Sequence, residues 1–128
     1  MYILLAGLSH KTAPVELRER IALSGKALER FYQDIKEEPA LEGTVVLSTC
    51  NRVEVYTTAR DLEEGKKALR DLVAQRLDVD DKYLDQVIYM PSCQQAIEHL
   101  FRVASGLESM VLGETEILGQ VRQAYNQA

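Results

Sequence analysis

Two cysteines, Cys50 and Cys93, carry the most nucleophilic side chains in this 128-residue sequence. Cys50 lies in the stretch VVLSTCNRVEVY, at the junction of two predicted strands, where a buried structural cysteine is not expected. A thiolate is a good nucleophile, and a nearby cation such as Arg52 would favour it. Cys93 competes, because it follows Ser92 at the predicted start of a helix, whose dipole also favours a thiolate. Spacing alone leaves Cys50 as a nucleophile or as a small apolar residue at a strand end.

The two histidines, His10 and His99, are scattered relative to the cysteines and lack the spacing of metal ligands, so no metal site is expected. His99 falls within a predicted helix whose apolar face is formed by Ile97, Leu100, Phe101 and Ala104. On a helical wheel, His99 lies about 200° from Ile97. We therefore expect His99 to face away from the core, beside other polar side chains.

Composition and charge narrow the class of protein. Hydrophobic residues make up 46% and charged residues 27% of the chain, which is ordinary for a globular domain. The net charge of −5 does not favour binding to nucleic acid. No apolar run approaches the roughly 20 residues that a membrane helix needs. Two cysteines without a secretory signal favour reduced thiols and a cytoplasmic protein.

The elements that must position these residues follow from hydrophobic periodicity. The pattern predicts a strand at residues 3–8, a short helix at 15–21, a helix after Ser24, strands at 45–47 and 53–57, a helix at 62–77 and a strand at 87–90. Asp61 and Glu64 have the spacing of a capping box and predict the start of the helix at 62–77. In the strand after Cys50, Arg52, Glu54 and Tyr56 alternate with apolar residues and indicate one solvated face. The order β-α-β-β-α-β predicts an α+β fold, the ferredoxin-like split βαβ, with an antiparallel sheet and helices on one face.

After Gly106 the pattern changes to a loop or short turn, and a further helix, opened by Ile117 and Leu118, is still running at Ala128. We expect this helix to continue in a longer protein. The sequence is accordingly divided into a domain of residues 1–112 and the beginning of this helix at 113–128. No unit of strand, GxGxxG and helix is present to bind a dinucleotide.

Three sequence blocks resemble one enzyme family. They are GLSHKTAPVELRER, LSTCNRVEVY and HLFRVASGLESMVLGETEILGQVRQAY, and they resemble the N-terminal catalytic domain of glutamyl-tRNA reductase. The resemblance implies reduction of glutamyl-tRNA(Glu) by NADPH to glutamate-1-semialdehyde, the first step of C5-pathway tetrapyrrole (porphyrin, haem) biosynthesis. It implies that the last helix is the start of a long connecting helix, beginning at Glu114, and that NADPH binds a domain outside this chain. It also implies that the full-length protein is a homodimer and that glutamate-1-semialdehyde aminomutase is a possible partner.

The resemblance also assigns roles to individual residues. Cys50 would be the nucleophile that forms a glutamyl thioester, and Arg52 would bind the glutamate side-chain carboxylate. His99 matches an activity-critical histidine, while His10 lies in a matching block without an assigned role. The remaining substrate-binding positions are Thr49, Asn51, Ser109, Glu114, Thr115, Glu116 and Gln120. Many members have Pro and Gln in place of Thr115 and Glu116, so contact there would run through the backbone.

Two other interpretations compete with an enzyme domain. One is a non-catalytic ferredoxin-like module for small-molecule binding or regulation, which needs no reactive thiol; its metal-carrier form would need a CxxC pair, which is missing. The other is a redox switch that pairs Cys50 with Cys93. Preferential alkylation of Cys50 at neutral pH would favour the enzyme, equal slow labelling the binding module, and a disulfide the switch.

Overall fold

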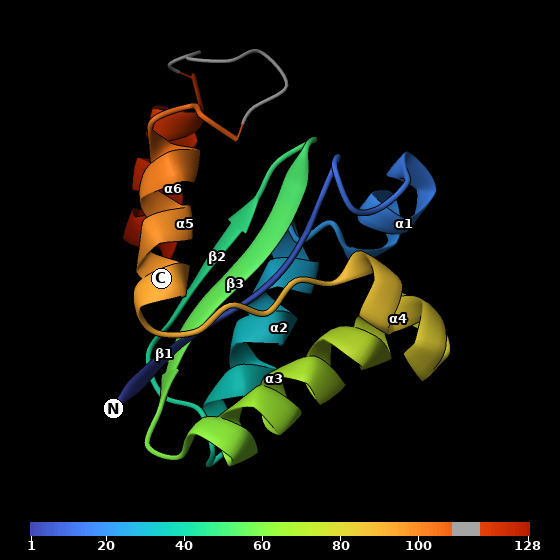
Figure 1. The fold of residues 1–128 in the computed structure, drawn as a ribbon, viewed down its shortest axis with the longest axis vertical. Helices are drawn as coiled ribbons and strands as arrows, with labels where there is room; N and C mark the ends of the chain where they lie inside the picture. The colour runs from blue at the N-terminus through green and yellow to red at the C-terminus, as the bar shows by residue number, and fades with distance from the viewer. Residues whose placement is uncertain (109–115) are drawn as a thin grey trace.

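The chain folds around a three-stranded antiparallel sheet in the order β1-β3-β2 (Figure 1). The computed structural model describes residues 1–108 and 116–128. The strands are β1 (Tyr2–Ser9), β2 (Thr44–Ser48) and β3 (Arg52–Ala59). β3 lies in the centre and pairs Ser9 with Arg52 at one end and Tyr2 with Ala59 at the other.

The helices follow the predicted pattern with one addition. They are α1 (Val15–Ile21), α2 (Gly25–Lys36), α3 (Leu62–Leu77), α4 (Asp81–Val87), α5 (Gln94–Ala104) and α6 (Glu116–Gln127). The predicted capping of α3 is confirmed, since the Asp61 side chain accepts a hydrogen bond from the Glu64 amide. The helix α4 was not predicted, although Asp80 caps it in the same way by accepting from the Tyr83 amide. No helix in the described part of the chain is long and apolar enough to cross a membrane.

Both faces of the sheet are covered, which differs from the predicted arrangement. The helices α2 and α3 cover one face, as expected, and place Phe31 and Leu69 against Val55 in the main core. The helices α5 and α6 cover the opposite face (Figure 1), where Val103 and Ile117 pack against Leu47. The polar residues of β3 therefore lie under a second helical layer.

The predicted fourth strand does not form as a regular strand. Val87 is the last residue of α4, and the chain then runs antiparallel to β1 through isolated bridges at Tyr89 and Ser92. The Gly7 and Tyr89 backbones exchange two hydrogen bonds of 2.9 Å. Pro91 has no amide hydrogen to donate, so at this position only the Leu5 amide bonds to the Pro91 carbonyl, at 3.1 Å, and the ladder stays irregular. The α+β class is confirmed, whereas the complete ferredoxin-like sheet is not.

The solvated face predicted for β3 is wrong, and so is the face predicted for α5. Arg52 and Glu54 are 2% and 0% exposed. In α5 the buried positions are Ala96 and Val103, whereas Phe101 is 69% exposed. A helix rotated in this way turns the side of His99 toward the sheet, because positions 96, 99 and 103 share one face.

Gly7 is required where the Tyr89 ring crosses β1. A Cβ atom at Gly7 would lie 2.5 Å from Tyr89 Cε2, closer than real contacts allow. We expect Gly7→Ala to lower the free energy of unfolding by about 1–3 kcal/mol, because the ring or the strand must shift. Urea denaturation measures this change. Gly119→Ala is the matched control: no atom lies within 4 Å of its added Cβ, so this helical site should be stabilised or unaffected. Equal effects of both substitutions would contradict the prediction.

Candidate functional site

The connection between β2 and β3 is a tight turn with Cys50 at its tip. Thr49 Oγ1 accepts hydrogen bonds of 3.2 Å from the Asn51 and Arg52 amides, and the Thr49 amide donates to the Arg52 carbonyl at 2.8 Å. Cys50 is a free thiol and is exposed. From α1, Arg18 Nη1 donates to the Cys50 carbonyl at 2.9 Å. The thiol is therefore exposed to solvent on a turn whose backbone is held by Thr49 from within and by Arg18 from α1.

His10 lies directly beside this turn. Its amide donates to the Asn51 carbonyl at 2.8 Å, because β1 ends opposite the start of β3. Its Nδ1 atom is buried and has no hydrogen-bond partner among the described residues. Burial lowers the pKa of His10, and the charge of Arg52 lowers it further. A neutral imidazole thus stands next to the cysteine turn, which the sequence analysis left without a role.

A buried carboxylate, Glu54, organises the covered face of β3. Its Oε2 atom accepts from the Tyr89 hydroxyl at 2.5 Å and from Arg52 Nη1 at 3.2 Å, while Tyr56 donates to Oε1 at 2.7 Å. His99 Nε2 lies 2.5 Å from the same Oε2 and must be the donor, because an ionised carboxylate only accepts. The expectation that His99 faces away from the core is therefore wrong: it points at a buried charge.

The electrostatics of this cluster favour an ionised Glu54. Burial by itself would raise the Glu54 pKa, but the hydrogen bond and charge of His99, together with Tyr89 and Arg52, bring it below 4.5. Burial and the neighbouring Glu54 charge raise the pKa values of Tyr56 and Tyr89. Both phenols consequently stay neutral and act as donors.

Arg52 is held by two different neighbours. Besides its ion pair with Glu54, its Nη2 atom donates to the Glu108 carbonyl at 2.6 Å. Arg52 follows Cys50 by two positions in the sequence. Its guanidinium and the His99 ring both contact Glu54. Its predicted role, binding the substrate carboxylate, stays a prediction. The structure shows how the group is oriented.

A hollow opens beside this cluster. It is lined by Ser9, Lys11, Thr12, Tyr89, Met90, Pro91, Gln95, His99 and Glu108. Its described lining includes His99 but not Cys50.

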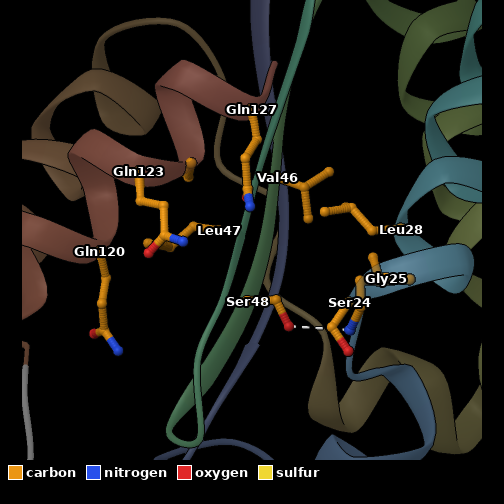
Figure 2. A pocket seen from close by; sticks show the side chains of 11 residues that line it. Ser24, Gly25, Leu28, Val46, Leu47, Ser48, Gln120, Gln123 and Gln127 are labelled. Carbon is orange, nitrogen blue, oxygen red and sulfur yellow. Dashed lines mark hydrogen bonds between the residues drawn. The ribbon is translucent and has the colours of Figure 1, made fainter.

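Gln120 lies in another part of the molecule. It lines a second hollow between α6, β2 and the start of α2, together with Gln123 and Ser48 (Figure 2). Ser48 is the last residue of β2 before the cysteine turn, and the residues of the turn itself do not line this hollow. Glu116 is exposed at the start of α6. The predicted residues Ser109, Glu114 and Thr115 lie outside the described residues.

Five residues of the site had no predicted role: Arg18, Glu54, Tyr56, Tyr89 and Glu108. Only Glu54 and Tyr56 had a local signal, since Arg52, Glu54 and Tyr56 alternate on one strand face and carry complementary polar groups.

Among residues 1–108 and 116–128, no group of three or more His, Cys, Asp or Glu side chains could hold a metal ion.

The comparisons with known proteins agree on one family. Residues 6–128 match the family described as "Glutamyl-tRNAGlu reductase, N-terminal domain". The chain is 44% identical over its whole length to the glutamyl-tRNA reductase of Pelotomaculum thermopropionicum and 48% identical to that of Syntrophotalea carbinolica; it covers 29% of each. The solved glutamyl-tRNA reductase of Methanopyrus kandleri superposes with a TM-score of 0.75 at 38% identity, over 98% of this chain and 28% of that one.

Fold and site together define an α+β domain with an exposed cysteine two positions before the arginine of a buried arginine, glutamate and histidine cluster. The chain belongs to the glutamyl-tRNA reductase N-terminal domain family. It spans 28–29% of the length of these relatives.

Proposed function

We propose that this chain is the part of a glutamyl-tRNA reductase that transfers the glutamyl group from tRNA(Glu) to Cys50. The observation that carries this proposal is the exposed Cys50 thiol on a braced turn, two residues from an arginine whose guanidinium is fixed by Glu54. Membership of the family supports the same assignment.

The acyl transfer needs a nucleophile and a cationic group that binds the side-chain carboxylate of the substrate. The Cys50 thiolate attacks the ester carbonyl carbon, a carbon–sulfur bond forms and the carbon–oxygen bond to the terminal ribose breaks. The proton that the Cys50 thiol gave up goes to the ribose oxygen, which leaves as a hydroxyl, and the glutamyl group remains as a thioester. No atom changes its oxidation state in this half of the reaction.

Arg52 is proposed to recognise the side-chain carboxylate of the glutamyl group, since a guanidinium offers paired donors that a neutral side chain would leave unmatched. Thr49 and Asn51 would form the rim around Cys50. His99 is proposed as the activity-critical histidine, and its ring is held by the hydrogen bond to Glu54. Ser109, Glu114, Thr115, Glu116 and Gln120 are proposed as the second block of substrate contacts.

Reduction of the thioester to glutamate-1-semialdehyde by NADPH completes the proposed reaction, in tetrapyrrole biosynthesis. The described strands pair only in antiparallel fashion, whereas a dinucleotide unit needs parallel strands joined through a glycine-rich turn and a helix. The described residues therefore do not fit NADPH, and we place its binding in a separate domain reached through α6. A cytoplasmic homodimer and contact with the aminomutase belong to the same proposal.

Trapping of the acyl-enzyme tests the proposal. The full-length protein is incubated with glutamyl-tRNA(Glu) without NADPH, quenched in acid and digested for peptide mass mapping. We expect a glutamyl adduct on the Cys50 peptide, cleavable by hydroxylamine, and release of uncharged tRNA. Cys93, whose amide donates to the Ile3 carbonyl, should stay unmodified and serves as the internal control. Equal labelling of both cysteines, or no adduct at all, would contradict the proposal.

A further inference from the structure

Glu108 joins three elements that lie far apart in the sequence. Its Oε2 atom accepts from Lys11 Nζ at 2.7 Å, its Oε1 atom from Arg102 Nε at 2.8 Å, and its backbone carbonyl from Arg52 Nη2 at 2.6 Å. These partners stand just beyond β1, near the end of α5 and at the start of β3. One residue thus connects the surroundings of the site to its buried arginine.

The two contacts of the Arg52 guanidinium differ in kind. The Glu54 contact is an ion pair between residues of the same strand. The Glu108 contact goes to a backbone carbonyl, and its position depends on the path of the chain after α5. That path turns at Gly106, which has a left-handed φ of 83°. Both carboxylate oxygens of Glu108 are bound, which restrains the backbone of the same residue.

The side chain is well suited to hold this position. Glu108 is only 16% exposed, whereas its partners Lys11 and Arg102 are 53% and 51% exposed. Hydrogen bonds from Lys11 and Arg102 lower the pKa of Glu108 to about 2, so the carboxylate keeps both partners across the working pH range. Two anchors on one carboxylate restrict its rotation more than a single surface ion pair would.

We propose that Glu108 is a positioning residue for Arg52: its two ion pairs fix the carbonyl that orients the guanidinium, and thereby set the preference for an acyl group bearing a carboxylate. The inference rests on the proposed function, in which Arg52 recognises the glutamate side chain. It goes further by assigning specificity to a residue that does not touch the substrate.

The test compares glutamyl-tRNA with glutaminyl-tRNA, which replaces the recognised carboxylate by a neutral amide of the same size. Single-turnover acylation of Cys50 is measured in the full-length enzyme with the same tRNA charged with either amino acid. Glu108→Gln keeps the backbone carbonyl and the size of the side chain but weakens both ion pairs. We expect the preference for glutamyl over glutaminyl to fall by about tenfold, because a misaligned guanidinium loses its paired contact. Glu108→Asp, which keeps the charge, should recover part of the preference.

Arg70→Gln is the matched control. It removes two ion pairs, with Asp81 and Asp85, from a part of the surface formed by α3 and α4. The control should leave the glutamyl-to-glutaminyl ratio unchanged. If Glu108→Gln does not fold, Lys11→Met and Arg102→Gln each remove one of the two anchors and should each lower the ratio.

The outcomes separate the inference from the function on which it rests. Equal slowing of both substrates by Glu108→Gln would overturn the inference, since a purely structural role changes both rates together. An unchanged ratio in Glu108→Gln, with a reduced ratio in Arg52→Gln, would also overturn it while leaving the proposed function intact. A wild-type enzyme that does not discriminate, or a ratio unaffected by Arg52→Gln, would instead refute the assigned role of Arg52.

Discussion

Replacement of Cys50 by serine is expected to lower single-turnover deacylation of glutamyl-tRNA(Glu) on the order of a thousandfold or more, as loss of a nucleophile does in other enzymes. A serine hydroxyl has almost no anionic form at neutral pH, so it cannot take the place of the thiolate. The turn itself should survive, because its hydrogen bonds use Thr49 and backbone groups rather than the thiol. Rapid-quench measurement of uncharged tRNA in the full-length enzyme reports the rate.

Cys93→Ser provides the comparison for this result. The Cys93 amide donates a hydrogen bond to the carbonyl of Ile3 in β1, and this contact does not depend on the Cys93 side chain. Activity close to wild type is expected for this variant. A redox pair of the two cysteines would instead make both substitutions equally harmful, and residual fast acylation in Cys50→Ser would place the nucleophile elsewhere.

Replacement of Glu54 by glutamine is expected to lower the free energy of unfolding by about 3–5 kcal/mol, the usual cost of removing one partner from a buried ion pair. Arg52 is 2% exposed and would lose its charged partner, while an amide nitrogen would face donors that a carboxylate satisfies. Urea denaturation measures the loss. Glu42→Gln is the control: it breaks a surface ion pair with Arg60, which is 92% exposed, and should cost less than about 1 kcal/mol.

The Glu54 substitution should also change the response to acid. Because the folded state lowers the Glu54 pKa below its ordinary value of 4.5, the protein binds this proton more weakly when folded than when unfolded. The stabilisation is therefore complete above the unfolded pKa and is lost as the pH falls through the lower folded value. Between pH 5 and 3, roughly, wild type should lose stability more steeply than Glu54→Gln. If the free energy of unfolding changed with pH in the same way for both proteins, Glu54 would not be ionised in the folded state.

Several features were predictable because they depend on neighbours in the sequence. Asp61 and Glu64 predicted the start of α3, and the bounds predicted for α1 match the structure. The strand before Cys50 followed from a short apolar run and the strand after it from alternation of apolar and polar residues, which left Cys50 at their junction. The family followed from long sequence blocks, and the comparisons confirm it. The roles of the individual site residues stay predictions, as do the boundary after residue 112 and the continuation of α6.

The covered face of the sheet could not be read from the sequence, because burial depends on which helix packs on which side. Arg52, Glu54 and Tyr56 have the alternation of a solvated strand face, and only the packing of α5 makes them a buried cluster. Ile97 and Phe101 were predicted to form the core face of α5, because the prediction used only the positions of hydrophobic residues on the helix. The structure instead buries Ala96 and Val103 and directs His99 to Glu54, because an ionised carboxylate inside the protein must find donors.

Local chemistry thus determined the helix caps, the strands of the central hairpin and the cysteine at its tip. Tertiary packing decided the surroundings of that cysteine: Arg18 on its carbonyl, His10 beside its turn, and Glu108 on Arg52. Residues 11 and 108 are 97 positions apart and form a 2.7 Å ion pair. No local pattern encodes such a pair, since each partner alone has the sequence context of an ordinary surface charge.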